Sequence, residues 1–386
     1  IQFETPNETK SVPLITLVRD AIFLFPQEED DGTLETLVLN GVGESGTLEI
    51  NGFELDDTEL DFTNEKPYVI YGYAAVPSGR TLNIAAGARV HFHSNSGIVV
   101  NAGGSIRING ALSEDQELLE NEVVFEGDRL EPQFAEVAGK WGTIWLRSGS
   151  TGNQIDHLTL KNASIGLLVD GPTSTTAPPN LILSNSQVFN SVTTNLWARG
   201  AKIRAANVVL GNSGSSSLYC NLGGDYAFVH STIANYWSSG FRNAAALRID
   251  HGTGTNPGTD FTNVTFSNSI VDGNRDVELL LVPAPNGAFV FNFRNCSFKF
   301  NDRNDNFEGN PLFDFTDSNR YQNPLVIRAT EFRAAARNDF SLLESSEIRG
   351  MGDLPTASGL PLDLLGNDRT TLPDLGAFQF VLPDIQ

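Results

Sequence analysis

The sequence predicts an all-β protein folded as a single three-faced parallel β-helix, a solenoid in which each coil of the chain stacks on the previous one. Three observations predict this fold. Polar residues, mostly asparagine, recur at intervals of about one coil. A shorter interval of eight residues separates the centres of successive strands. The 36 glycines and the many Asn-rich turns favour strands joined by tight corners over helices.

The first observation is a ladder of residues that each follow a short apolar run. Its members are Asn162, Asn185, Asn207, His230, Asn268 and Asn295, separated by 23, 22, 23, 38 and 27 residues. Asparagine tolerates the left-handed backbone torsions of a sharp corner, and stacked amides can hydrogen-bond from coil to coil. The interval of 38 residues indicates an insertion, which we place in the loop from His251 to Asp260.

The second observation is the spacing of Val90, Ile98 and Ile106, which lie eight residues apart, with glycines at the intervening corners. Three such units of strand and corner make a coil of about 24 residues, which agrees with the ladder. Two independent periodicities therefore indicate the same three-faced coil.

The chain divides into three parts. Residues 1–62 combine apolar runs at 14–18 and 21–25, acidic residues at 28–31, and an alternating pattern over 36–55 that predicts a hairpin followed by a further strand. We expect this N-terminal β segment to cap the solenoid. Residues 63–310 form the parallel β-helix. The rhythm then stops, and residues 311–386 are predicted to supply the last coils and a capping tail, because the exposed edges of an open solenoid recruit other chains.

Composition excludes several classes of partner. The net charge of −22 disfavours nucleic acid, anionic lipid surfaces and polyanionic substrates. No apolar run approaches the ~20 residues of a transmembrane helix. Because the sole methionine is Met351, we expect that a piece preceding Ile1 has been removed, which favours export. Cys220 and Cys296 match no metal motif and are predicted to be free thiols, with Cys296 buried.

Two stretches carry a resemblance to known proteins. The tail resembles the closing segment of many bacterial right-handed parallel β-helix proteins through Asp363, Gly366, Arg369, Pro373, Asp374, Gly376, Ala377 and Phe378. Residues 66–93, with 125–132 and 139–156, look like a Bacteroidetes-type family of secreted β-helix surface lipoproteins. The resemblance covers roughly residues 64 to 380. It implies a right-handed β-helix, export, and an outer-surface anchor through a lipidated cysteine upstream, which this sequence does not contain. The family has no assigned activity.

Aromatic residues are the candidates for binding. Trp141, Trp145, Tyr236 and Trp237 could offer flat faces on which sugar rings stack, and residues 128–140 interrupt the strand rhythm and could wall a groove. The competing interpretation is that these aromatics pack loops onto the solenoid.

A metal site is a weaker hypothesis. His91 and His93 lie two apart on a strand, so both point to one face and could donate two nitrogens to zinc or copper. No third ligand is evident nearby, and an outward polar face explains the pair equally well.

The catalytic hypothesis is a polysaccharide lyase or glycoside hydrolase. Its candidates are Asp225, Asp250 and Asp272, which recur about once per coil, with Arg248 and Arg275 as basic partners. A lyase of this kind would bind Ca²⁺ through the carboxylates. In the non-catalytic case no cofactor is required.

The sequence thus favours an exported protein on the outer surface of a bacterium that displays a rigid face for binding a glycan or another surface protein, without catalysis. The alternative is an enzyme that degrades an extracellular polysaccharide. A structural spacer or adhesin stalk, which would lack a ligand, is the third option.

Overall fold

The computed structural model describes residues 2–5, 8–11, 20–28, 30–41, 46–171, 178–252 and 258–382. It is nearly all-β, and in these residues the one α-helix is α1 (Leu354–Gly359). Strands β1 (Gln2–Thr5) and β2 (Glu8–Ser11) pair with each other. The apolar run predicted at 14–18, Glu29 and the centre of the loop from His251 to Asp260 lie outside the described residues.

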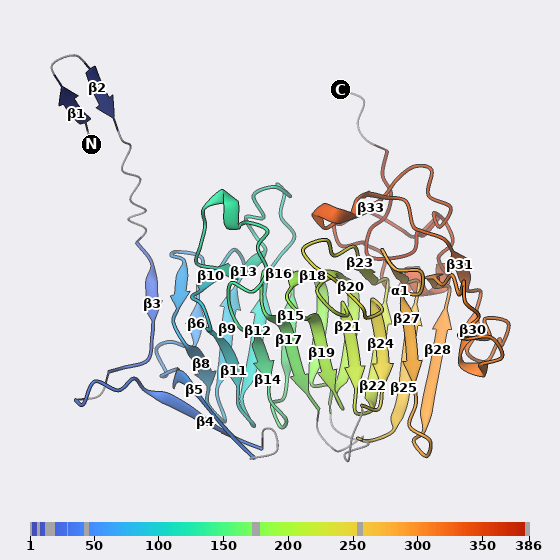
Figure 1. Ribbon diagram of the computed structural model, residues 1–386, viewed down its shortest axis with the longest axis horizontal. Helices are drawn as coiled ribbons and strands as arrows, with labels where there is room; N and C mark the ends of the chain where they lie inside the picture. The colour runs from blue at the N-terminus through green and yellow to red at the C-terminus, as the bar shows by residue number, and fades with distance from the viewer. Residues whose placement is uncertain are drawn as a thin grey trace.

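Most strands follow one another in triplets, and each triplet contributes one strand to each of three ladders of parallel pairs (Figure 1). The first ladder consists of β6 (Asp61–Phe62), β9 (Thr81–Ala85), β12 (Ser105–Asn109), β15 (Asn153–Asp156), the first halves of β18 (Leu181–Ser191) and β20 (Lys202–Ser213), β22 (Gly224–Val229), β25 (Phe261–Ser267), β28 (Phe289–Arg294) and β30 (Tyr321–Gln322). The second consists of β3 (Ile22–Leu24), β7 (Tyr68–Ile70), β10 (Arg89–Phe92), β13 (Val123–Gly127), β16 (Leu158–Lys161), the second halves of β18 and β20, β23 (Thr232–Asn235), β26 (Ile270–Gly273), β29 (Ser297–Lys299) and β31 (Leu325–Ile327). The third consists of β5 (Thr47–Glu54), β8 (Tyr73–Val76), β11 (Gly97–Val100), β14 (Ile144–Leu146), β17 (Ile165–Asp170), β19 (Thr194–Arg199), β21 (Leu218–Asn221), β24 (Leu247–Asp250) and β27 (Leu279–Val282).

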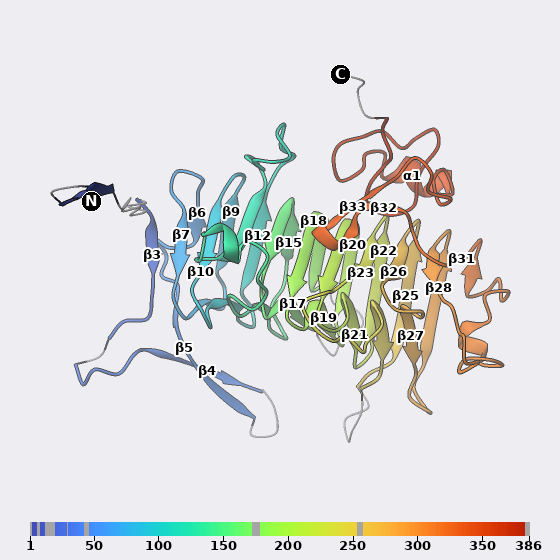
Figure 2. The same cartoon turned by 45° about the horizontal axis from the view of Figure 1, so that its top comes forward.

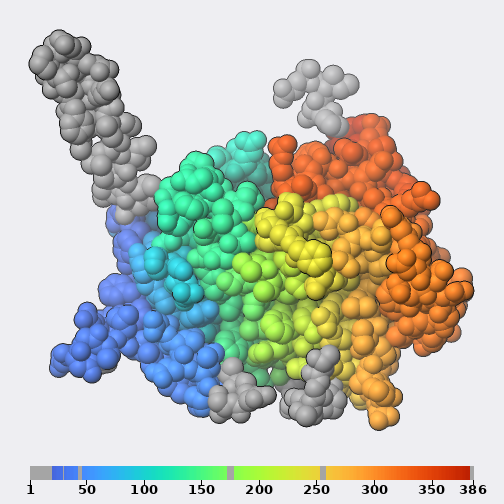
Figure 3. All heavy atoms as spheres, in the orientation of Figure 1, coloured from blue at the N-terminus to red at the C-terminus, as the bar shows by residue number. Residues whose placement is uncertain are grey.

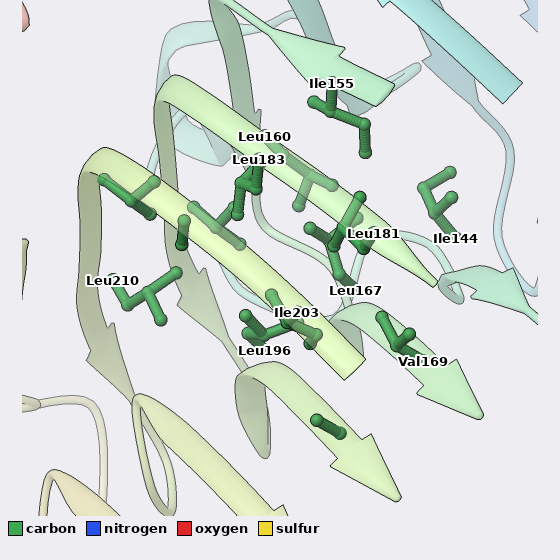
Figure 4. Close-up of a cluster of buried hydrophobic side chains, with 14 of the residues drawn as sticks. Ile144, Ile155, Leu160, Leu167, Val169, Leu181, Leu183, Leu196, Ile203 and Leu210 are labelled. Carbon is green, nitrogen blue, oxygen red and sulfur yellow. The ribbon is translucent and has the colours of Figure 1, made fainter. Parts of the chain in front are cut away.

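The core lies between the three ladders. Alternate residues of each strand point inward and stack on the equivalent residue of the next triplet, as the two-residue period of a strand requires. Figure 4 shows this arrangement for aliphatic side chains such as Ile155 and Leu183, which pair in register and are buried. Toward the C-terminal end the same inward row becomes aromatic. Its members are Phe228, Phe266, Phe293 and Tyr321, with successive ring centroids 4.9, 5.2 and 5.6 Å apart.

The corner between the first and second ladders holds the polar ladder. His157, Asn185, Asn207, His230, Asn268, Asn295 and Asn323 all have positive φ there. Asn207 Nδ2 donates to Asn185 Oδ1 over 3.0 Å, which is the coil-to-coil bond that the sequence predicted.

The assignment of Asn162 to this ladder is wrong. Asn162 lies at the next corner, between the second and third ladders, where Asn190 Nδ2 donates to its Oδ1. In the triplet that contains Asn162, the ladder position is instead occupied by His157, which the sequence pattern did not reveal. His157 follows Asp156, and Asp156 pairs with Ser184, the residue before Asn185.

The predicted N-terminal hairpin is confirmed. Strand β4 (Thr36–Asn40) pairs antiparallel with β5, which also pairs with β8. Leu37 and Leu39 of the hairpin pack against the outer side of the third ladder, where they contact a cluster that includes Val99 and Trp145.

The tail lies along the side of the ladders rather than over their end. Residues from Thr330 onward run back across the outer face of the second ladder (Figures 1 and 2), where β32 (Phe332–Ala334) and β33 (Asp339–Leu342) help to cover Val209, Ala234 and Ile270. The C-terminal end of the core is instead covered by the Phe-rich segment from Phe300 to Phe315. The predicted capping tail therefore covers the outer face of the second ladder, and the segment from Phe300 to Phe315 covers the C-terminal end of the core.

A candidate binding groove at one corner

The four predicted aromatic residues occupy different environments. Trp141 is a core residue: its side chain is 1% exposed, its ring stacks on Phe92 at 4.3 Å, and its Nε1 donates to the carbonyl of Lys161. Its proposed role in binding sugars is therefore wrong. Trp145 points outward, but it lies under the N-terminal hairpin and donates to Asp170 over 2.8 Å.

Tyr236 and Trp237 lie together after β23 but face different surroundings. Tyr236 is half-buried beneath the tail, with its ring edge-on to Phe332. Trp237 is half-buried and lines an open groove of about 770 Å³. Of the four predicted aromatics, Trp237 is thus the one that the structure places in this groove.

Three segments from successive triplets form this groove, which we call the Trp237 groove. They follow β23, β26 and β29, so all three leave the second ladder at the same corner. The loop after β23 (yellow) stands at the surface beside the orange segments (Figure 3). The lining residues are Trp237, Gly240, Phe241, Arg242, Asn243, Ala245, Asn274, Arg275, Asp276, Val277, Leu280, Asn301, Asp302, Arg303, Asn304, Asn306 and Phe307.

A buried ion pair holds the loop after β23 in place. Arg242 donates to the two oxygens of Glu278 over 2.9 and 2.6 Å, and these side chains are 2% and 0% exposed. Glu278 also accepts from the backbone amides of Ala246 and Arg275, each at 2.7 Å. Burial raises the pKa of Glu278, while the bonds from Arg242 oppose that rise. Three of the four bonds that this carboxylate accepts thus join the segment after β26 to the loop after β23, and the fourth, from Arg275, lies within its own segment.

The exposed edge of the groove carries an aromatic ring. Phe241 is 90% exposed, although it belongs to the loop that the buried pair fixes. Asn274 Nδ2 donates to the carbonyl of Trp237 over 2.9 Å, and Asp276 pairs with Arg303 at 3.0 Å. The groove therefore offers indole and phenyl faces beside amide, carboxylate and guanidinium groups, a combination suited to binding a polyhydroxylated ligand.

Two smaller hollows lie along the same corner. Trp237 also lines one of about 220 Å³, together with Glu136, Asn190 and Asn338. The other, of about 280 Å³, lies beside the segment 128–140, which the sequence analysis proposed as a groove wall. That segment crosses the corner at Ala135, whose carbonyl accepts from Asn162 Nδ2 over 2.8 Å.

The predicted catalytic carboxylates do not converge. Asp225 lies on the first ladder, Asp250 on the third and Asp272 on the second. The spacing of about one coil was misleading because Asp225 and Asp250 belong to the same triplet, on different faces. The proposed joint site is therefore wrong.

Each of these acids has local partners of its own. Arg204 binds Asp225 at 2.7 Å, and this bond helps to lower the carboxyl pKa although burial acts to raise it. Asp250 accepts from Arg248 at 2.5 Å on the outer side of the third ladder. Asp272 is buried under the tail, where burial raises its pKa and the amide of Thr330 donates to it. Arg275 lines the Trp237 groove and is the one member of the predicted set found there.

The two histidines of the metal hypothesis have separate acidic neighbours. His91 is buried with its Nδ1 3.7 Å from Glu126, whereas His93 is largely exposed and its Nδ1 lies 2.7 Å from Asp128. Among the described residues, no group of three or more His, Cys, Asp or Glu side chains is arranged to hold a metal ion. Cys220 and Cys296 are both buried and unbridged, as predicted.

Sequence reasoning missed the residues that build the groove. Arg242 and Glu278 are 36 positions apart, and neither belongs to a recognisable motif. Phe241 gave a weak signal, since it is a large apolar residue in a polar stretch between two strands. Comparisons of this chain with known protein families and with curated proteins find no match. In the described residues, no helix has the length and apolar character needed to cross a membrane.

Proposed function

We propose that the three ladders form a right-handed parallel β-helix, and that the protein is exported to the outer surface of a bacterium, where it binds a glycan in the Trp237 groove without catalysis. The right hand is the one that connections between parallel strands almost always adopt. The resemblance of residues 64 to 380 to secreted surface proteins supports export and a lipid anchor upstream.

The Trp237 groove is the observation that carries the proposal. It is open, it spans three successive triplets, and it combines Trp237 and Phe241 with polar side chains. Neighbouring parallel strands lie about 4.8 Å apart, so three triplets extend about 10 Å along the stack. A groove of this length suits part of an extended chain, whereas a purely structural spacer would not need a groove. A glycan is favoured over a protein ligand because most of the side chains that line the groove are polar.

An enzyme that degrades polysaccharides is the alternative, but no specific observation favours it. The carboxylates proposed for that reaction lie on three faces. Within the groove, Asp276 is paired with Arg303, and Asp302 accepts from the backbone amides of Asn306 and Phe307 at 2.9 and 2.7 Å.

The test is binding to a glycan array by the wild-type chain and by Trp237→Ala and Phe241→Ala variants. We expect the wild type to bind a defined set of glycans and each variant to bind at least about tenfold more weakly. Truncating an aromatic hot spot costs about 2 kcal/mol or more, and tenfold corresponds to about 1.4 kcal/mol. Phe25→Ala is the matched control, because Phe25 is 51% exposed and lies far along the chain from the groove.

Binding that survives both groove substitutions would contradict the proposal. Incubating the array glycans with the chain and recording the absorbance of unsaturated uronides, together with reducing ends, tests the enzyme directly. Turnover in either assay would replace the non-catalytic proposal.

A further inference from the structure

The hollow beside the segment 128–140 concentrates positive charge in an acidic protein. Its lining residues are Glu126, Gly127, Arg129, Leu130, Phe134, Ala135, Lys140, Lys161 and Asn162, and we call it the basic pocket. Three of these side chains are cationic and one is anionic, whereas the whole chain has 25 basic and 47 acidic residues. The local excess of charge is therefore opposite in sign to that of the protein.

Lys140 is placed in this pocket by close packing against the second ladder. A Cβ atom at Gly127 would meet Lys140 Cβ at 2.6 Å, so the glycine allows the lysine stem to lie against the strand. The Lys140 amide also donates to the Asn162 carbonyl over 2.9 Å. Its ammonium lies 4.5 Å from the centroid of the Phe134 ring and, among the described residues, takes part in no ion pair. The packing thus places at the pocket an ammonium that makes no direct ion pair, although the charge of Glu131 is near enough to interact with it.

The other two cations flank Lys140. Lys161 Nζ lies 3.0 Å from Glu126, and the Arg129 guanidinium lies over the Phe134 ring at 4.2 Å while it pairs with Glu131 at 3.0 Å. Each retains further N–H donors beyond its carboxylate contact. An anionic group in the pocket would therefore meet one ammonium that makes no direct ion pair and donors from two flanking cations.

The net charge of the protein does not prevent this. At physiological ionic strength, charges more than about 8 Å away are largely screened, so the field inside the pocket is set by the groups around it. Glu126 and Glu131 pair with Lys161 and Arg129, and Glu136 lies near Lys161, which leaves Lys140 as the lining cation without a direct ion pair. A long polyanion would still be repelled by the rest of the surface, which favours a ligand whose charge is confined to one unit.

We propose that the basic pocket binds an acidic sugar residue, one that carries a carboxylate or a sulfate ester on its ring, at one end of the glycan bound in the Trp237 groove. This inference rests on the proposed glycan-binding function. The hollow of about 220 Å³, lined by Glu136 and Trp237, lies between the two sites along the corner.

The experiment uses an array on which each neutral oligosaccharide is printed beside its uronate and its sulfated counterparts. We expect the wild type to bind one acidic form more tightly than the neutral form, and the two acidic series show whether a carboxylate or a sulfate is preferred. Lys140→Met should weaken binding of the acidic form about tenfold, the size expected for one charge-assisted hydrogen bond, and leave the neutral form unchanged.

Two further variants separate charge from folding. Lys140→Arg keeps the charge and should retain the acidic preference. Lys66→Met removes an exposed lysine that pairs with Asp20 just before β7 and does not line the pocket, and it should have no effect.

Equal binding of acidic and neutral forms by the wild type overturns the inference, as does an unchanged acidic preference in Lys140→Met. If neutral glycans bind through Trp237 without acidic preference, the basic pocket fails while the groove stands. If acidic glycans bind in a way that depends on Lys140 but not on Trp237, the pocket stands and the proposed groove fails.

Discussion

Replacing His230 with asparagine should remove a large part of the loss of stability that acid causes in this protein. His230 is fully buried at the ladder corner, with φ 47°, and burial together with Arg369 lowers its pKa from 6.5 to about 3. The unfolded chain therefore takes up a proton below pH 6.5 that the folded chain refuses until about pH 3. Stability conferred by the neutral ring is complete above pH 6.5 and is lost as the pH falls toward 3.

The hydrogen bonds explain why the ring cannot accept this proton. Asn268 Nδ2 lies 2.9 Å from His230 Nε2 and also donates to the carbonyl of Asp353, while Asn268 Oδ1 accepts from the Asp353 amide at 2.7 Å. The amide of Asn268 cannot turn over without losing both bonds to Asp353. A protonated Nε2 would therefore face another donor.

The magnitude follows from the shift in pKa. One pKa unit corresponds to about 1.4 kcal/mol, so at pH 5, which is 1.5 units below 6.5, His230 should lower the free energy of unfolding by about 2 kcal/mol. Asparagine suits the positive φ and can bond along the ladder, as Asn207 does with Asn185. Any loss of packing in His230→Asn is the same at both pH values and cancels in the comparison.

The assay is urea unfolding, followed by tryptophan fluorescence, of the wild type and the variant at pH 7 and pH 5. We expect the wild type to lose about 2 kcal/mol more than His230→Asn on acidification. His93→Asn, which alters a largely exposed histidine, should behave like the wild type. Equal losses in the wild type and His230→Asn would refute the reasoning.

Three other predictions concern the groove, the tail and the thiols. Glu278→Ala should lower the free energy of unfolding by about 3–5 kcal/mol, because it leaves the buried Arg242 charge unpaired, and it should abolish glycan binding. Urea unfolding measures the first effect and the glycan array the second. A variant that is as stable as the wild type and still binds glycan would show that the ion pair does not hold the groove in place. Phe340→Ala should lower the free energy of unfolding by about 3–5 kcal/mol and make the tail more susceptible to limited proteolysis. The Phe340 ring is buried against Gly211, where a Cβ atom would come within 2.3 Å of it. Cleavage of the tail at an unchanged rate would contradict this packing. Cys220 and Cys296 should not react with a thiol reagent at pH 8 until the protein is denatured, because both are buried and burial raises the pKa of Cys296 to about 12. Prompt reaction of either thiol in the native protein would contradict this prediction.

The corners show how far residue types alone predict this structure. Asparagine at 185, 207, 268 and 295 follows from the need for left-handed torsions at a sharp turn, and the structure has positive φ at each. The hairpin at 36–54 and the buried thiols were predictable for similarly local reasons. The misplacement of Asn162 arose because two corners of the same triplet, at His157 and Asn162, both use left-handed residues five positions apart. Spacing could not tell which of them continues the ladder.

The candidate site was predictable only in fragments. Trp237 was identified as a binding residue, whereas Arg275 was proposed for catalysis and the predicted wall at 128–140 lies beside the basic pocket instead. Trp141 was misassigned because an aromatic residue next to a glycine looks the same in the core and on a loop. Asp225, Asp250 and Asp272 seemed aligned because the coil was assumed to be regular, but the insertion between His230 and Asn268 shifts the register of every later residue.

The strands, the repeating corners and the chemical character of the core could be predicted from residue types, because each depends on torsional preference and on alternation within a few residues. Which loops meet at one corner, that Arg242 reaches Glu278, and that the tail lies over Val209 and Ala234 follow only from how the coils stack. These contacts join residues far apart in the chain, and they depend on the lengths of the loops within each coil. No local sequence pattern predicts how loops of different length come together, so the groove and the basic pocket are visible only in the folded structure.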